Sequence, residues 1–407
     1  MRVGEGIWGD YSGIYICRLI MTRISTGIIG LRSKQLAGLS ALGVLLLVAG
    51  CADFFVYPGS TGTGTGTKAG SDYVYVANHT TKTLSGYSVG SGALSPISGS
   101  PYTLSFAPNA AVVNPANTRL FVAGVDAGAG YIASYSISST GALTLLNTTN
   151  TGLADPISMD ISPDGKWLIG LDGNGITVDE YQINATNGTL TLGNGQSYLI
   201  PKSVVVPRAI KISPGGNYIF AAIGTAGDLI FPFDTTTGAL SSPTGLSLPG
   251  NVSDNALAVS PNGNTLYIAR SGSNGGLAAY SISSTGALQA LTTNPYAAGS
   301  QPLAVVVTGD GNNVYVANQA DATISGYTIA SNSTATPTTG SPYSNASGPS
   351  GLAIDNSGKY LLSISNAGSP DLTLFALDTA TPGKLNLIAS TSTGTDPTGA
   401  ISIAATH

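Results

Sequence analysis

Side chains that can carry hydrolytic chemistry are scarce in this sequence. The 407 residues include two histidines, His79 and His407, and a single glutamate beyond residue 51, Glu180. General-base or metal-assisted hydrolysis needs a titratable group beside the reacting carbon, so few positions can serve. Glu180 lies in the alternating stretch Val178-Asp-Glu-Tyr181, which favours a solvated carboxylate on a strand over a catalytic one.

Arginine provides the clearest candidate contacts for an anionic ligand. Arg208 follows a proline at the opening of a predicted strand. A guanidinium placed there can clamp a carboxylate or phosphate through two parallel hydrogen bonds, and pairing with a neighbouring aspartate is the alternative. Arg270, which ends a Tyr-Ile-Ala-Arg strand, is the second candidate. His79, which follows a Tyr-Val-Ala-Asn strand end, is a third candidate ligand contact, or else it faces a loop surface.

Four acidic or amide residues stand just before predicted strands of one kind. They are Asp155, Asp254, Gln301 and Asp396. The last three are candidate ligand contacts, and Asp155 is, with Arg208, a candidate catalytic residue that would activate water. Capping of loops and turns is the alternative for all four. The sequence predicts no metal site and no cofactor.

The strands that must position these residues belong to one unit repeated seven times. An aromatic strand residue recurs at spacings of 48, 46, 52, 47, 47 and 48. These residues are Tyr87, Tyr135, Tyr181, Phe233, Tyr280, Tyr327 and Phe375. A Gly-x-Leu turn follows six of them, and a Ser-Pro-Asp-Gly turn or a relative of it precedes six. A period of about 40 to 50 residues with four short strands indicates a β-propeller blade, whereas a β-helix repeats every 20 to 30 or so.

The two ends of the repeat region are predicted to meet in the first blade. Blades two to seven open with an inner strand that begins near a proline, whereas the first repeat starts directly on its second strand at Tyr73. The missing strand is found in Pro397–Ala404, which would complete blade one and remove an open edge. We therefore expect an all-β, seven-bladed propeller of four-stranded antiparallel blades over residues 72–407. The candidates that precede inner strands would then ring one mouth of its central channel.

Composition agrees with this fold and excludes several classes of protein. Charged residues make up 9% of the chain, against about 25% in an average soluble protein, and it contains 54 glycines. These values exclude a coiled coil and a charge-driven disordered chain. The net charge of −5 argues against nucleic acid as a partner, because phosphate recognition needs basic surfaces.

The first fifty residues carry the features of an export signal. The apolar stretch Leu36–Gly50 follows several basic residues and has 15 residues, whereas a mature membrane span needs about 20. The stretch Leu47-Val-Ala-Gly-Cys51 is similar to the lipobox of bacterial lipoproteins, in which the cysteine is lipidated. We expect residues 1–50 to be a signal peptide, with 1–20 an over-extended start, and Cys51 to be lipidated. An uncleaved signal anchor is the alternative.

The predicted lipoprotein would be tethered rather than rigidly attached. Residues 51–71 include an alternating Gly and Thr stretch, which is typical of a flexible linker. Cleavage would remove Cys17 and leave only the lipidated cysteine, so neither a disulfide nor a thiol nucleophile is expected. The expected location is the bacterial cell envelope, at the periplasmic or outer-membrane face, with the membrane as a partner through the lipid.

The strand ends and turns together resemble a known group of proteins. Tyr-Val-Ala-Asn at residues 75–78 and 315–318, with Ser-Pro-Asp-Gly at residues 162–165, looks like the YVTN-type propellers of the lactonase-like group. That group includes propeller 6-phosphogluconolactonases and muconate lactonising enzymes. The resemblance covers Asp72–His407 and implies His, Arg and Glu residues grouped around the channel on one face. Pro207-Arg208 matches the start of the group's Pro-Arg-His element, but Ala209 takes the third position.

Two classes of function remain open. The sparse histidines and glutamates favour a cell-envelope binding module whose channel face takes a glycan, a small anionic ligand or an envelope protein. The alternative is a lactone hydrolase of the 6-phosphogluconolactonase type, in which Arg208 holds the carboxylate or phosphate of a lactone and an aspartate activates water. A closed ring predicts a monomer.

Overall fold

The computed structural model describes the repeat region and leaves the N-terminal region undescribed. The described residues are 72–90, 92–151, 155–174, 177–193, 198–200, 206–366, 368–394 and 400–407. The predicted signal peptide, Cys51, the linker and Asp396 lie outside them. Across these ranges every regular element is a strand, so no helix there has the length and apolar character of a membrane span.

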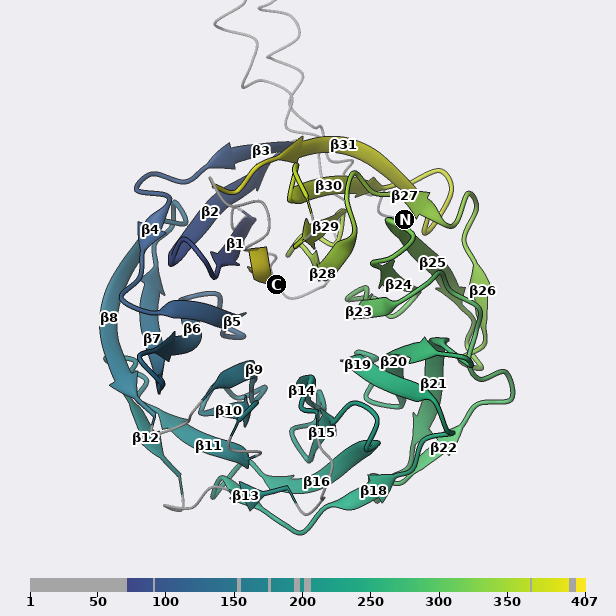
Figure 1. Ribbon diagram of the computed structural model, residues 1–407, viewed down its shortest axis with the longest axis horizontal. Helices are drawn as coiled ribbons and strands as arrows, with labels where there is room; N and C mark the ends of the chain where they lie inside the picture. The colour runs from purple at the N-terminus through teal and green to yellow at the C-terminus, as the bar shows by residue number, and fades with distance from the viewer. Residues whose placement is uncertain are drawn as a thin grey trace, which may run out of the picture. The chain divides into compact units, whose positions relative to one another are not determined.

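Seven antiparallel sheets stand around a common axis and form a closed ring (Figure 1). Blade 1 contains β32 (Ala400–Ala405), β1 (Tyr73–Asn78), β2 (Thr83–Gly90), β3 (Ala93–Pro96) and β4 (Tyr102–Thr103). Blade 2 contains β5 (Ala107–Val113), β6 (Arg119–Asp126), β7 (Ala129–Ile137) and β8 (Leu143–Asn150). Blade 3 contains β9 (Pro156–Ile161), β10 (Trp167–Asp172), β11 (Thr177–Ile183), β12 (Leu190–Leu192) and β13 (Tyr198–Leu199). Blade 4 contains β14 (Ala209–Ile212), β15 (Tyr218–Ala222), β16 (Asp228–Asp234), β17 (Ala239–Leu240) and β18 (Thr244–Leu246).

The other three blades follow the same order from the channel outward. Blade 5 contains β19 (Val252–Val259), β20 (Thr265–Gly272), β21 (Gly276–Ile282) and β22 (Leu288–Ala290). Blade 6 contains β23 (Pro302–Val307), β24 (Asn313–Asn318), β25 (Thr323–Ile329), β26 (Ala335–Pro337) and β27 (Tyr343–Ser344). Blade 7 contains β28 (Pro349–Ile354), β29 (Tyr360–Ser365), β30 (Leu372–Leu377) and β31 (Leu385–Thr391). In four blades the outermost position is occupied by two short strands. Both of them pair with the strand that is third from the channel in that blade. The predicted seven-bladed propeller, with four strand positions in each antiparallel blade, is confirmed.

The first blade is closed by the C-terminal strand, as the sequence predicts. β32 pairs antiparallel with β1, with Val74 opposite Ala405 and Asn78 opposite Ala400. Beyond the ladder, the Thr406 N–H donates to the Tyr73 carbonyl at 2.9 Å, and the Thr406 hydroxyl accepts from the Tyr73 N–H at 3.0 Å. The channel-facing edge of β1 is therefore paired with β32 rather than open.

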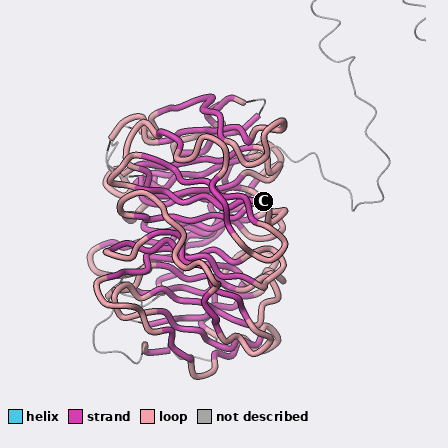
Figure 2. Tube along the Cα trace, turned by 90° about the vertical axis from the view of Figure 1, so that its right-hand side faces the viewer, coloured by secondary structure: helices cyan, strands magenta, loops and turns pink. Residues whose placement is uncertain are grey.

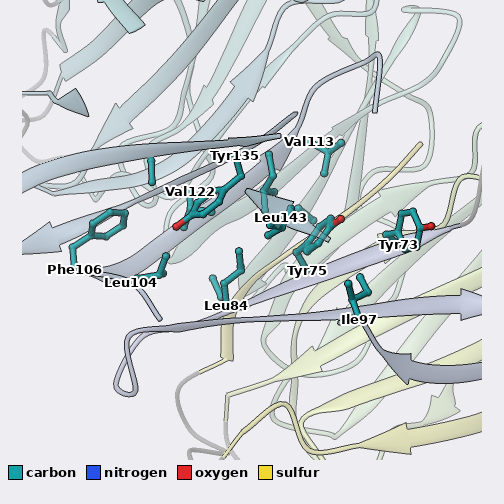
Figure 3. Close-up of a cluster of buried hydrophobic side chains, with 14 residues drawn as sticks. Tyr73, Tyr75, Leu84, Ile97, Leu104, Phe106, Val113, Val122, Tyr135 and Leu143 are labelled. Carbon is teal, nitrogen blue, oxygen red and sulfur yellow. The ribbon is translucent and has the colours of Figure 1, made fainter. Parts of the chain in front are cut away.

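The hydrophobic cores lie between neighbouring blades. One cluster joins blades 1 and 2 and includes the fully buried Tyr75, Leu84, Leu120 and Val122 (Figure 3). The second strand of a blade is buried on both faces because each face packs against another blade, and β1 is an example with every residue buried. This arrangement explains the continuous apolar runs of the second strands, in contrast to the alternation of half-exposed strands.

The Gly-x-Leu turns join one blade to the next. Gly141 has a φ of 78°, and a Cβ atom there would lie 2.4 Å from the ring of Tyr73. A Cβ atom at Gly238 would likewise lie 2.4 Å from the ring of Trp167. The indole N–H of Trp167 donates to the Thr235 carbonyl at 2.8 Å. Glycine is required because the turn needs both a left-handed backbone and room for the aromatic side chain of the preceding blade.

The inner strands all start at one face of the ring and end at the other. Loops and turns gather on these two faces, as the edge-on view in Figure 2 shows. We name the face where inner strands begin the entry face and the face where they end the exit face. Neighbouring inner strands are joined by side chains, since Ser158 Oγ accepts from the Ile210 N–H at 3.2 Å and Ser402 Oγ from the Ala111 N–H at 3.0 Å.

Candidate functional site

A pocket of about 630 Å3 opens on the entry face and is lined by residues of blades 1, 2, 3 and 4. Most of its lining residues lie at the ends of second strands or at the beginnings of inner strands. Its lining is His79, Asn109, Val125, Gly128, Asp155, Ile157, Asn174, Pro207, Arg208 and Ile401. We call it the His79 pocket. Three residues that the sequence singles out separately, His79, Asp155 and Arg208, therefore lie in one cavity.

His79 is held in one tautomer by the neighbouring blade. It follows β1, and its Nδ1 atom lies 3.0 Å from the carbonyl oxygen of Pro108 in β5. A carbonyl oxygen only accepts hydrogen bonds, so Nδ1 must carry the hydrogen. In the neutral ring, Nε2 then carries the lone pair. No described residue contacts this Nε2 atom, so it can accept a hydrogen bond from water in the pocket.

Asp155 is the acidic group of the pocket and is fixed by two partners. Its Oδ1 accepts from the Asn109 side-chain amide at 2.6 Å, and its backbone N–H donates to Asp172 Oδ1 at 2.8 Å. Burial and the charge of Asp172 raise the pKa of Asp155, while the Asn109 hydrogen bond and the proximity of His79 act in the opposite direction. The raised pKa and the cavity together are features of a functional carboxylate.

Arg208 brings a positive charge that no described residue neutralises. It precedes β14, and its backbone N–H donates to the Ala222 carbonyl at 2.9 Å. The side chain is exposed at the pocket, and its guanidinium makes no ion pair or hydrogen bond with any residue that the structure describes. Arg208 can therefore take an anionic group on a ligand through two hydrogen bonds.

The sequence pattern of most of the repeat region identifies the family. Residues 68–206, 226–339 and 288–401 match the family described as lactonase, seven-bladed beta-propeller. The chain belongs to this family. No curated protein is similar enough in sequence to count as a match.

Solved structures show the same fold as this lactonase-family propeller. The periplasmic gluconolactonase of Pseudomonas aeruginosa is 19% identical with a TM-score of 0.65, over 80% of this chain and 97% of that chain. A Bacteroides uniformis protein, provisionally named a 6-phosphogluconolactonase, is 19% identical with a TM-score of 0.69, over 82% and 99%. A Lactobacillus plantarum protein is 17% identical with a TM-score of 0.69, over 83% and 99%. At these identities the likeness concerns the fold.

Arg270 and Asp254 of the lactonase-family propeller are paired with each other, away from the His79 pocket. Arg270 Nε and Nη2 donate to the two carboxylate oxygens of Asp254 at 2.6 and 2.7 Å, and Nη2 also donates to the Tyr280 hydroxyl at 3.1 Å. The side chains of the pair are only 3% and 0% exposed. Asp254 lies inside β19 rather than before it, directly opposite Arg270 across a β-bulge. The two residues therefore join strands β19 and β20, and neither guanidinium nor carboxylate faces the pocket.

The remaining candidates lie apart from the pocket. Gln301 stands before β23 with a φ of 55° and an exposed side chain, and it does not line the His79 pocket. Glu180 is 3% exposed, so the expectation of a solvated carboxylate is wrong. The side chain of Glu180 in β11 packs closely against the backbone of Gly193. A Cβ atom built at Gly193 would lie only 2.9 Å from Glu180 Cγ. In the described part of the chain, no three His, Cys, Asp or Glu residues are grouped to hold a metal ion.

Asn109 is a residue of the His79 pocket that the sequence analysis did not single out. It lies in β5, on the inner strand of blade 2, and it is the amide that fixes Asp155. The available signal is its position, because Asn109 follows Pro108 near the opening of an inner strand as Arg208 follows Pro207.

Proposed function

We propose that this lactonase-family propeller hydrolyses a small lactone that carries one anionic substituent, at the His79 pocket. The observation that carries the proposal is that one cavity brings together a guanidinium without a partner among the described residues, a histidine whose Nδ1 is bound to a backbone carbonyl, and a carboxylate. The family match and the fold shared with a periplasmic gluconolactonase support it. Binding without turnover, which the scarcity of histidines favours, is the second candidate.

Each residue has a distinct task in the proposed reaction. Arg208 holds the anionic substituent and so places the lactone carbonyl within the pocket. His79 Nε2 takes a proton from water as the water oxygen bonds to the carbonyl carbon. The ring C–O bond then breaks, and the imidazolium returns the proton to the departing ring oxygen, so that lactone and water give one hydroxy acid. The Asp155 carboxylate stabilises the imidazolium, and Asn109 holds Asp155 in place.

Turnover of a lactone panel tests the proposal. We expect the purified protein to open carboxylated or phosphorylated sugar-derived lactones, monitored by the acid released. Arg208→Ala should lower kcat/KM by about 10- to 100-fold, chiefly by losing a charge-assisted bidentate contact. His79→Gln should lower kcat. Arg119→Ala is the matched control, because Arg119 donates to the Ala185 carbonyl outside the pocket.

The same variants separate hydrolysis from binding. If the folded protein opens no lactone, yet binds the corresponding hydroxy acid with an affinity that depends on Arg208, the protein is a binding module at this site. If neither turnover nor binding depends on Arg208, the pocket is not the functional site.

We also propose that the propeller is a cell-envelope lipoprotein tethered through Cys51. The lipobox-like stretch supports this proposal. Acyl-chain labelling in a bacterial host should mark the wild-type protein and not Cys51→Ala. Recovery of an unlabelled wild-type protein that still begins before residue 51 would contradict it.

A further inference from the structure

A second cavity opens at the exit face of the channel and is larger than the His79 pocket. It measures about 940 Å3, and residues from all seven blades line it. Most of the lining is aliphatic, because each inner strand ends in small or branched apolar residues. Among these residues are Val112, Ile161, Ile212, Leu257, Val306, Ala353 and Ile403. The proposed hydrolysis uses none of them.

One ion pair lies in the wall of this exit cavity. Lys211 Nζ is 3.5 Å from Asp160 Oδ1, while Asp160 Oδ2 accepts from the Ile212 N–H at 2.8 Å. The lysine side chain is 42% exposed and the aspartate 16%, so the pair faces the cavity rather than the core. A separation of 3.5 Å for a partly exposed pair indicates a weak interaction that a ligand can replace.

The charge of the lining is negative. Asp310 and Asp355 also line the cavity, which gives three side-chain carboxylates with Asp160 against the ammonium of Lys211 and the imidazole of His407. Burial opposes the ionisation of Asp310, but hydrogen bonds from Thr308 and Asn312 outweigh it and lower the pKa of Asp310. Fields of like charges add within a low-dielectric channel mouth, so this mouth attracts cations and repels anions.

We propose that the exit cavity binds an organic cation with an apolar body, such as an alkylammonium compound. The apolar part would cover the ring of aliphatic residues, and the positive group would lie at Asp160 in place of Lys211. The volume falls in the range of about 300 to 1,000 Å3 that is usual for small-molecule sites. The site is separate from the His79 pocket and does not depend on the proposed hydrolysis.

Charge-matched probes of equal chain length test this assignment. We expect decyltrimethylammonium to bind saturably with one site per chain in titration calorimetry, below its micellar concentration. Decanoate should bind about tenfold more weakly or not at all, because only the sign of its head group differs. Asp160→Asn should weaken the ammonium several-fold, and Val306→Arg, which fills and charges the cavity, should abolish binding.

Matched controls distinguish the exit cavity from general adsorption. Asp234→Asn removes an exposed carboxylate elsewhere in blade 4 and should leave the affinity unchanged. A hydroxy acid bound at the His79 pocket should not displace the cation. Equal affinity for the two probes, or ammonium binding that is unaffected by Asp160→Asn, would overturn the proposal. The asparagine variant alone decides the question if Val306→Arg fails to fold.

Discussion

At the scale of single residues, the His79 pocket depends on contacts made by one dipeptide. Pro108 fixes the tautomer of His79 through its carbonyl oxygen, and Asn109 fixes Asp155 through its amide. Both residues stand at the beginning of β5, which belongs to a blade that carries neither His79 nor Asp155. Blade 2 therefore orients chemical groups that blades 1 and 3 supply.

Replacing Asn109 should move the acid side of the pH–rate profile. The Asn109 hydrogen bond lowers the pKa of Asp155, so Asn109→Leu should raise that pKa further. If catalysis needs the ionised carboxylate, activity will then be lost at a higher pH during acidification than in the wild type. The measurement is kcat/KM against pH for both proteins.

A shift of the acid limb to lower pH, or an unchanged limb with an intact fold, would contradict this role of Asn109. Asn147→Leu, on the outer strand β8, provides a matched loss of an amide away from the pocket.

At the scale of elements, the repeat was predictable because each blade must bury the same faces. The seven aromatic positions fall in the third strand of each blade, and the closing strand was found from a missing inner strand. The pairing of Arg270 with Asp254 was not predicted, because it depends on the register between β19 and β20 across a bulge. Asp155 and Arg208 were predicted to lie at one mouth of the channel, because both precede inner strands, whereas His79 follows a second strand and was named separately. That His79 lies in the same cavity was not predicted, because it depends on which second-strand end faces the beginnings of the inner strands of blades 3 and 4.

The junction of blade 1 with blade 7 should make stability depend on pH. Burial, and then the nearby carboxylate of Asp355, raise the pKa of Asp72 from 3.8 to about 6. A carboxyl group with a raised folded-state pKa stabilises the fold below its unfolded-state pKa, and this contribution is lost as pH rises through the folded-state value. The loss should therefore occur between about pH 4 and pH 6.

Asp72→Asn should remove this pH dependence. Because Asp72 is partly exposed, we expect the variant to be more stable than the wild type by about 1 kcal/mol at pH 8, and equally stable near pH 4. Chemical denaturation at the two pH values measures the difference. A variant that is less stable at pH 8, or equally stable at both values, would show that Asp72 and Asp355 do not interact as described.

At the scale of the whole molecule, the ring depends on β32. Removal of residues 400–407 would leave the fully buried β1 without its inner partner and would uncover the core between blades 1 and 2. We expect a loss of about 5 kcal/mol or more, which corresponds to a fall in Tm of roughly 7 °C or more for a domain of this size. Ala404→Arg, which places a charge in the same core, should act in the same direction. An unchanged Tm for both variants would exclude closure by this strand.

The pairing of β1 with β32 also sets an order of events during synthesis. Tyr73 and Thr406 are separated by 333 positions, and a ribosome adds about 5 to 20 residues per second. For roughly 15 to 70 seconds, β1 must wait for its partner while the other blades emerge and fold. During that interval its apolar faces and its free edge are available to other nascent chains. Among the strands that the structure describes, the first one made is the last one protected, so chaperone capture and misassembly during translation should concentrate on β1.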